Sequence, residues 1–337
     1  MIANVDGTQI GITGVGAYVP ERILTNADLE QMVDTSDEWI VERTGIRERR
    51  IAEDSQAASD LALPACQDAL AQAGVRAEDI DYIVVATATP DMIFPATACI
   101  VADQLGSTRA AAYDLLAGCT GFMYALAQAY AALAGGLAQR ALVIGSETLS
   151  KITNWNDRST CIIFGDGAGA AVVERVTDGG FLGFELGADG SGGLDLCVPA
   201  SGSRTPITPQ TIDQELQYIK MNGREVYRFA TRVMVTSAEG LLEACGATID
   251  DVDLYVPHQA NKRIIDHAAK HLGLPPEKVL VNIDRYGNTS SASIPLGLVE
   301  AVEDGRIKPG TRVLLSGVGA GLTWGSAYLT WSNGNGS

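Results

Sequence analysis

The sequence predicts an α/β fold made of two related halves. Apolar runs with the length of strands alternate with helical patterns along the 337 residues, as in proteins whose sheets are covered by helices. Two pairs of segments, one member in each half, repeat the same order of elements. Apolar residues make up 46% of the chain, which is enough for a large buried core.

The alternation is clearest in six segments. Strands are expected at residues 82–87, 141–145, 254–257 and 312–316. Helices are expected at residues 59–73 and 226–244. A first repeat is visible among them. The helix that ends at Ala73-Gly74 is followed by a strand at residues 79–84, and in the second half the strand at residues 251–256 follows Cys245-Gly246 in the same way.

A second repeat relates two helix starts. Residues 119–136 and 288–305 share a pattern, and both their starts and their ends are 169 residues apart. If the halves pack about a pseudo-two-fold axis, the two helix N-termini converge and Asn288 lies opposite Cys119. The alternative is that all helix and strand repeats look alike at this level of similarity.

Composition narrows the class of protein. The formal net charge of −17 argues against a nucleic-acid partner. No apolar run approaches the roughly 18 residues of a membrane span, and the N-terminal segment lacks a basic region followed by an apolar one. The six cysteines form no C-x-x-C pair and no cluster with histidine, so we expect reduced thiols and no zinc site. A cytoplasmic protein is expected.

The glycine-rich run at residues 165–170 is not interpreted as a nucleotide site. Its G-x-G-x-G-x spacing differs from the dinucleotide-binding pattern, and the strand-like residues 171–173 follow it where that pattern requires a helix. Close backbone packing explains the run better.

Cys119 is the first candidate for chemistry. It lies between a strand-like run and an Ala-rich helical pattern, so its sulfur is expected at a helix N-terminus. There the helix dipole and free N–H groups favour a thiolate, lower the pKa of the thiol and supply donors for an oxyanion. The alternative is an inert, buried cysteine.

His258 and Asn288 are the candidate partners. His258 lies at the turn between an expected strand and helix, where α/β proteins place reacting groups, whereas His267 and His271 are expected on a solvated helix face. Asn288 precedes a helix and is also a suitable N-cap. The glycine-rich turn after the strand at 312–316 exposes N–H groups that can complete an oxyanion hole.

Together these segments resemble the β-ketoacyl-acyl carrier protein synthase III family of the thiolase superfamily. The resemblance runs from about residue 10 to residue 331 and rests on Asp34-Thr35-Ser36-Asp37-Glu38-Trp39-Ile40, Arg43-Thr44-Gly45-Ile46, Gly118-Cys119-Thr120-Gly121-Phe122, residues 163–170, Val256-Pro257-His258-Gln259-Ala260-Asn261, Gly287-Asn288-Thr289-Ser290 and Leu322-Thr323-Trp324-Gly325. It implies a thiolase-like fold with five αβαβα layers and two thiolase-like halves, residues 1–175 with the nucleophile and residues 176–337 with the histidine and asparagine.

The resemblance implies an acyltransferase that starts type II fatty-acid synthesis. Cys119, His258 and Asn288 match the family's catalytic triad. A short acyl-CoA acylates Cys119, and decarboxylative condensation with malonyl-acyl carrier protein then gives β-ketoacyl-acyl carrier protein, CO₂ and CoA. The chemistry needs no metal or redox cofactor, because coenzyme A arrives as a substrate thioester, and the family is homodimeric.

Other positions also match the family. The N–H groups of Cys119 and Ala320 match the oxyanion hole. The coenzyme A positions are Trp39 and Arg158 at the adenine, Arg43 nearby and Asn261 toward the pantetheine. Phe94 matches a position that shapes the acyl pocket, and Arg263 matches one linked to docking of the carrier protein.

The sequence departs from the family pattern at two places, and two alternative functions remain open. Residues 201–217 form a longer connection than usual, and Ala320 replaces a glycine found in some members. A synthase III-like acyltransferase of secondary metabolism would carry the same triad, and a non-catalytic partner subunit would not need it. The chain length and branching of the primer are not evident from the sequence.

Overall fold

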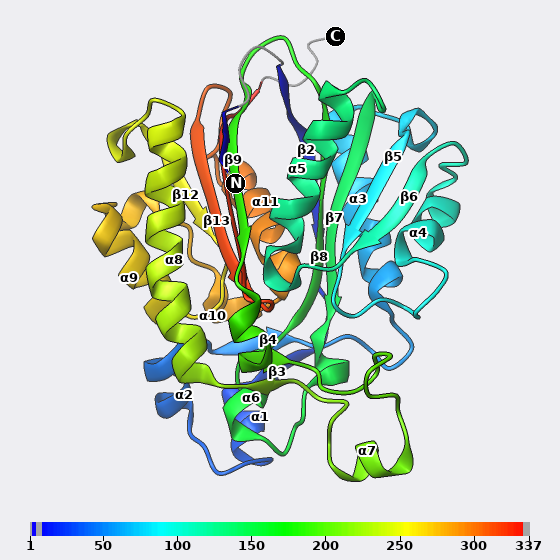
Figure 1. The fold of residues 1–337 in the computed structure, drawn as a ribbon, viewed down its shortest axis with the longest axis vertical. Coiled ribbons are helices and arrows are strands. Elements are labelled where there is room, and N and C mark those ends of the chain that lie inside the picture. The colour runs from blue at the N-terminus through cyan, green and yellow to red at the C-terminus, as the bar shows by residue number, and fades with distance from the viewer. Residues whose placement is uncertain (1, 5–8, 333–337) are drawn as a thin grey trace.

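Two five-stranded sheets face each other across a central pair of helices, with further helices on both outer faces (Figure 1). The computed structural model describes residues 2–4 and 9–332. This is the five-layered αβαβα arrangement of the predicted thiolase-like fold, which is confirmed. The N-terminal segment in which we predict no leader lies largely outside the described residues. Among the helices described, none is both long and apolar enough to cross a membrane.

The first sheet has the strand order β2, β8, β7, β5, β6. Its strands are β2 (Ile10–Tyr18), β5 (Tyr82–Ala86), β6 (Ala111–Leu115), β7 (Arg140–Thr148) and β8 (Asp166–Arg175). β5 pairs in parallel with β6 and β7, whereas β8 pairs antiparallel with β7 and β2. The helices α3 (Ala58–Ala73) and α4 (Thr97–Leu105) bury their apolar faces against its outer side.

The second sheet has the order β1, β9, β14, β13, β12. Its strands are β1 (Ile2–Asn4), β9 (Gly180–Ala188), β12 (Leu254–Pro257), β13 (Arg312–Gly319) and β14 (Thr323–Thr330). Only β12 and β13 run parallel. The helices α8 (Gly223–Ala244) and α9 (Lys262–Leu272) pack on its outer side. Apart from β1, the strands of each sheet come from one half of the chain; the division after residue 175 stays a prediction.

The central layer holds α5 (Gly121–Ala134) and α11 (Ser293–Glu303). Each is preceded by a 3₁₀ turn, η2 (Gly118–Thr120) before α5 and η7 (Ser290–Ala292) before α11, and the two turns contact each other. The predicted convergence of two helix N-termini is therefore confirmed. The predicted alignment of the two helices is wrong at their starts. α5 begins at Gly121, so the 169-residue offset predicts that α11 begins at residue 290, but it begins three residues later, at Ser293.

Most of the remaining elements gather at one end of the layers (Figure 1). They are β3 (Ile23–Thr25), α1 (Asn26–Glu30), α2 (Asp37–Thr44), β4 (Glu48–Arg50), α6 (Arg158–Cys161), β10 (Leu196–Cys197), α7 (Pro209–Asp213), β11 (Lys220–Met221) and α10 (Ile283–Tyr286). Five further 3₁₀ turns are η1 (Ala77–Asp79), η3 (Leu149–Ile152), η4 (Gly190–Asp195), η5 (Ile249–Asp251) and η6 (Pro276–Lys278).

The glycines of residues 165–170 serve close packing, as predicted. Gly165 precedes β8 and the other two glycines lie within it. A Cβ on Gly169 would lie 2.6 Å from Cβ of Pro295 in α11. On the neighbouring strand β7, a Cβ on Gly145 would lie only 2.3 Å from the carbonyl oxygen of Ser291 in η7. These glycines let the central helix and the turn before it approach the sheet.

We predict that Gly145→Ala destabilises the protein by about 3 kcal/mol, because its methyl group displaces the backbone of η7. Chemical denaturation measures the change in the free energy of unfolding. Gly190→Ala is the matched control, since no atom lies within 4 Å of its added Cβ. Equal stability of the two variants would show that η7 is not held by this contact.

Candidate active site

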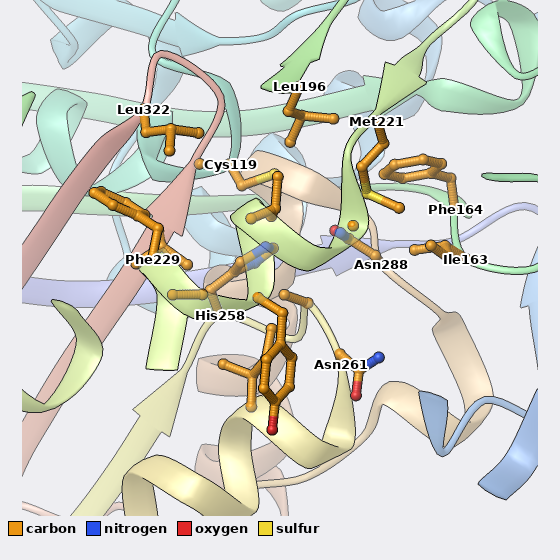
Figure 2. Close-up of a pocket in the computed structure, with 18 residues that line it drawn as sticks. Cys119, Ile163, Phe164, Leu196, Met221, Phe229, His258, Asn261, Asn288 and Leu322 are labelled. Atoms are coloured by element: carbon orange, nitrogen blue, oxygen red, sulfur yellow. The ribbon is translucent and has the colours of Figure 1, made fainter. Parts of the chain in front are cut away.

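Two cavities meet at Cys119. The first, of about 160 Å³, is lined by Cys119 together with His258 and Asn288. The second, of about 560 Å³, lies on another side of the same cysteine and is mostly apolar, with Ala320 on its wall. Figure 2 shows the side chains of Cys119, His258 and Asn288 converging in the first cavity. The structure thus brings together three residues that are far apart in the chain.

The backbone around Cys119 is shaped by two glycines. Cys119 is the middle residue of η2, one turn before α5, and Gly118 before it has a φ of +52°. A Cβ on Gly118 would lie 2.9 Å from the nitrogen of Ala320, and a Cβ on Gly319 would lie 2.7 Å from the nitrogen of Cys119. The turn after β13 is therefore packed against η2, and both predicted oxyanion donors, the N–H groups of Cys119 and Ala320, belong to this contact.

The protonation state of Cys119 differs from the prediction. The thiol is only 9% exposed, and burial raises its pKa to about 12, although the Ser290 side chain acts in the opposite direction. The position before α5 was expected to lower this pKa; in the folded chain, burial outweighs that contribution. The resting group at neutral pH is therefore a thiol.

His258 is held as a neutral imidazole. It follows β12, its N–H donates to the Ser316 carbonyl oxygen at 2.8 Å, and its side chain is 1% exposed. Burial lowers the pKa of the ring to about 3. Nδ1 lies 2.5 Å from the hydroxyl of Ser293, whereas Nε2 has no hydrogen-bond partner among the described residues. An unpaired buried nitrogen beside a cavity is a place for a substrate atom.

Asn288 presents an amide donor to the same cavity. Its Oδ1 accepts the N–H of Ser290 at 2.8 Å, which leaves Nδ2 as the free end of the side chain. Its backbone is fixed on both sides, since its N–H donates to the Ile163 carbonyl at 2.9 Å and its carbonyl accepts the N–H of Gly165 at 3.0 Å. These backbone bonds hold the residue outside α11 and explain why the helix begins later than the repeat predicts.

Arg49 is a supporting residue that sequence reasoning missed. It is fully buried, and its guanidinium donates to the carbonyl oxygens of Leu24 and Ile162 and to Oδ1 of Asn26 at 2.8–3.2 Å. Burial lowers its pKa to about 10, so it remains charged at neutral pH. It anchors the segment whose next residue, Ile163, holds Asn288. Side chains alternate between the two faces of β4, and Arg49 faces the core. This is the only signal that distinguishes it from the neighbouring arginines, which are less buried.

The predicted coenzyme A residues form a separate cluster. The guanidinium groups of Arg43 and Arg158 lie 4.7 and 4.8 Å from the centre of the Trp39 ring. Asn261 lines the first cavity, and its amide makes two hydrogen bonds: Oδ1 caps α9 by accepting the N–H of Arg263, and Nδ2 donates to the Arg43 carbonyl at 3.0 Å. These two bonds fix the amide at the cavity wall and leave its second N–H available to a ligand.

Two other predicted residues lie at the surface. Arg263 is exposed and its guanidinium is 5.7 Å from the ring of Tyr227, which lines the first cavity. Phe94 is 82% exposed and is not among the residues that line either cavity of its own chain. Within one chain, Phe94 therefore does not line the cavities at Cys119.

The remaining candidates fall outside the site. His267 and His271 stack at 3.9 Å on α9, and among the described residues no group of three potential metal ligands is found. In the longer connection, α7 lines neither of these two cavities, whereas the flanking Val198 and Ile219 line the second one.

The comparisons with known proteins agree with this geometry. The family model "3-Oxoacyl-[acyl-carrier-protein (ACP)] synthase III" matches residues 113–190, and its C-terminal counterpart matches residues 242–331. The chain is 57% identical over 323 residues to the β-ketoacyl-[acyl-carrier-protein] synthase III of Symbiobacterium thermophilum, covering 96% of this chain and 98% of that protein.

Solved structures give the same picture. The synthase III of Thermus thermophilus superposes with a TM-score of 0.89 at 54% identity, covering 96% of this chain and 99% of that one. A priming β-ketosynthase from the R1128 polyketide biosynthetic pathway has a TM-score of 0.89 at 35% identity, covering 98% of this chain and 99% of the other.

The buried His258 predicts a specific pH dependence of stability. Its folded-state pKa of about 3 is below its ordinary value of 6.5, so the unfolded chain binds the proton first as the pH falls. The neutral ring therefore costs no stability above about pH 6.5. Below it, the free energy of unfolding falls with pH, by about 2 kcal/mol at pH 5. Denaturation at pH 7 and pH 5 should show this loss in the wild type and not in His258→Asn. The exposed His271→Asn serves as control; an unchanged pH dependence in His258→Asn would contradict the assignment.

Proposed function

The chain belongs to the 3-oxoacyl-[acyl-carrier-protein] synthase III family, the condensing enzymes that initiate fatty-acid synthesis, and we propose that both half-reactions of the condensation take place at Cys119. The observation that carries this proposal is the convergence of one thiol and two neutral nitrogen groups in one cavity. The chain is 57% identical to the synthase III of Symbiobacterium thermophilum and 35% identical to the polyketide enzyme, which favours fatty-acid synthesis over secondary metabolism.

In the first half-reaction, the sulfur of Cys119 attacks the thioester carbonyl of a short acyl-CoA. The N–H groups of Cys119 and Ala320 stabilise the oxyanion, the bond to the coenzyme A sulfur breaks, and the acyl group remains on Cys119. The thiol proton ends on the departing coenzyme A thiolate. No protein group needs to keep that proton, which suits a buried site whose cysteine and histidine are both uncharged at rest.

In the second half-reaction, malonyl-acyl carrier protein occupies the cavity beside His258 and Asn288. Loss of CO₂ leaves its electron pair as an enolate, whose oxygen accepts hydrogen bonds from Nε2 of His258 and Nδ2 of Asn288. The carbanion attacks the acyl-Cys119 carbonyl and the carbon–sulfur bond breaks. The Cys119 thiolate then takes a proton from solvent. Neutral donors stabilise the enolate without protonating its carbon.

The substrates meet the protein at different places. We assign the adenine end of coenzyme A to the Trp39 cluster with Arg43 and Arg158, because flat cations and an indole suit a purine and its phosphates. Arg263, near the first cavity, is assigned to an acidic carrier protein. In this proposal hydrogen-bond donors supply the stabilisation, so the reaction uses no resident metal or redox cofactor. We also propose that it takes place in the cytoplasm.

We further propose a homodimer in which Phe94 of one copy reaches the second cavity of the other. Ile93, Phe94 and Leu116 are 86%, 82% and 75% exposed, and Leu116 also lines the second cavity. The N–H of Thr97 donates to the Asp114 carboxylate at 2.7 Å, which holds the segment after Phe94 against β6, an edge strand of the first sheet. An exposed apolar edge next to a cavity opening suits a second copy.

We predict that Asn288→Ala stops condensation and leaves acylation of Cys119 largely intact. Removing one oxyanion donor typically costs about 100 to 1000-fold in rate. Acylation is followed by intact mass after mixing with acetyl-CoA, and condensation by CO₂ release from malonyl-acyl carrier protein. Asn156→Ala, an exposed residue, is the control. An equal loss of both steps would refute the assignment of Asn288 to the second step.

For the dimer, we expect Phe94→Asp to weaken self-association about 30-fold, as for loss of a buried aromatic anchor. Sedimentation velocity over a range of concentrations measures this. Leu137→Asp is the control, because it alters a different exposed apolar residue (79% exposed), and it should leave the dimer unchanged. A monomeric wild type, or an unaffected Phe94→Asp dimer, would exclude the arrangement.

A further inference from the structure

The partner of His258 is unusual in being a hydroxyl. Nδ1 of a functional histidine is commonly held by a carboxylate or a backbone carbonyl. Here it lies 2.5 Å from Oγ of Ser293, the first residue of α11, and both side chains are buried at 1% and 2% exposure. The contact joins the strand end of β12 to the central helix.

The hydrogens of this contact can be counted. Oγ of Ser293 also lies 3.3 Å from the N–H of Gln259, for which it is the acceptor. Within residues 9–332, the one acceptor found for the serine hydroxyl is Nδ1 of His258. If Nδ1 carried the proton of the neutral ring, two N–H groups would point at Oγ and the serine hydrogen would have no acceptor. A buried unpaired donor costs about 1–3 kcal/mol. The arrangement with the hydroxyl donating to Nδ1 leaves no such group at Ser293.

We propose that Ser293 is a positioning residue that holds the neutral His258 ring in the tautomer with its proton on Nε2. The histidine then offers a hydrogen-bond donor to the cavity that it shares with Cys119 and Asn288. In contrast to a carboxylate, a hydroxyl adds no negative charge beside the ring, so it orients the imidazole without favouring the imidazolium.

The catalytic consequence rests on the proposed function. An Nε2–H group matches the role of enolate donor beside Nδ2 of Asn288. The same tautomer has no lone pair on Nε2, so it does not take the proton of Cys119. Ser293 is therefore needed for condensation and not for acylation, in which the thiol proton passes to coenzyme A.

The tautomer can be measured without any reaction. The chain has three histidines, and among the described ones only His258 is fully buried, so ¹⁵N-histidine labelling gives few signals. A long-range ¹H–¹⁵N spectrum of the wild type should show a protonated Nε2 and an unprotonated Nδ1 for His258, with assignment by His258→Asn. A protonated Nδ1 in the resting protein would overturn the proposal.

Two variants test the serine itself. In Ser293→Ala the His258 signals should shift toward a mixture of tautomers, and condensation should fall about 10 to 100-fold while acylation of Cys119 stays within about two-fold. Ser293→Thr keeps the hydroxyl and should restore both the Nε2–H signal and condensation. Ser237→Ala is the matched control, because it removes another buried hydroxyl contact, that to Ser326, away from the cavities.

These outcomes separate the two proposals. If Ser293→Ala keeps the Nε2–H tautomer and full condensation, Ser293 has no positioning role. If the wild type shows the Nε2–H tautomer but releases no CO₂ from malonyl-acyl carrier protein, the proposed function fails and the structural assignment stands.

Discussion

The close contact between the two 3₁₀ turns of the central layer is the constraint on which the rest of the site depends. η7 can lie against β7 only because Gly145 has no side chain, and the Ser291 hydroxyl then reaches the Ala86 carbonyl and the carboxyl of Glu147 at 2.8 and 2.9 Å. Glu147 is fully buried and also accepts from the N–H of Ala88 and the hydroxyl of Thr89. A polar network thus joins the two halves of the chain at the turn that precedes α11.

The second feature of the site is that it is electrically neutral at rest. Burial raises the pKa of the Cys119 thiol and lowers that of the His258 ring, so each stays in its uncharged form at neutral pH. Charge appears when a substrate carbonyl becomes an oxyanion or an enolate, and fixed N–H groups are then already in place. Stabilisation of this kind is strongest where water is excluded, because the donors need no reorientation during the reaction.

Much of this arrangement could be predicted from the sequence. The strand and helix patterns predicted an α/β fold with two related halves, and the family resemblance implied the five layers. The repeat of residues 119–136 in residues 288–305 indicated that Cys119 and Asn288 would meet. The start of α11 could not be predicted, because it depends on backbone bonds between Asn288 and the distant Ile163 and Gly165. The pKa of Cys119 was misjudged for a similar reason: the helix is a local property, whereas burial depends on the whole fold. Ser293 was one of several serines at a helix start, and only the structure shows which one faces His258.

The central claim is that Cys119 carries the acyl group between two reactions at one site. Intact-mass spectrometry of a single turnover tests it most directly. Acyl-CoA alone should give one acyl adduct, located at Cys119 by peptide mapping, and added malonyl-acyl carrier protein should discharge it with one CO₂ released per adduct. An adduct on another residue, or one at Cys119 that malonyl-acyl carrier protein does not discharge, would contradict the account.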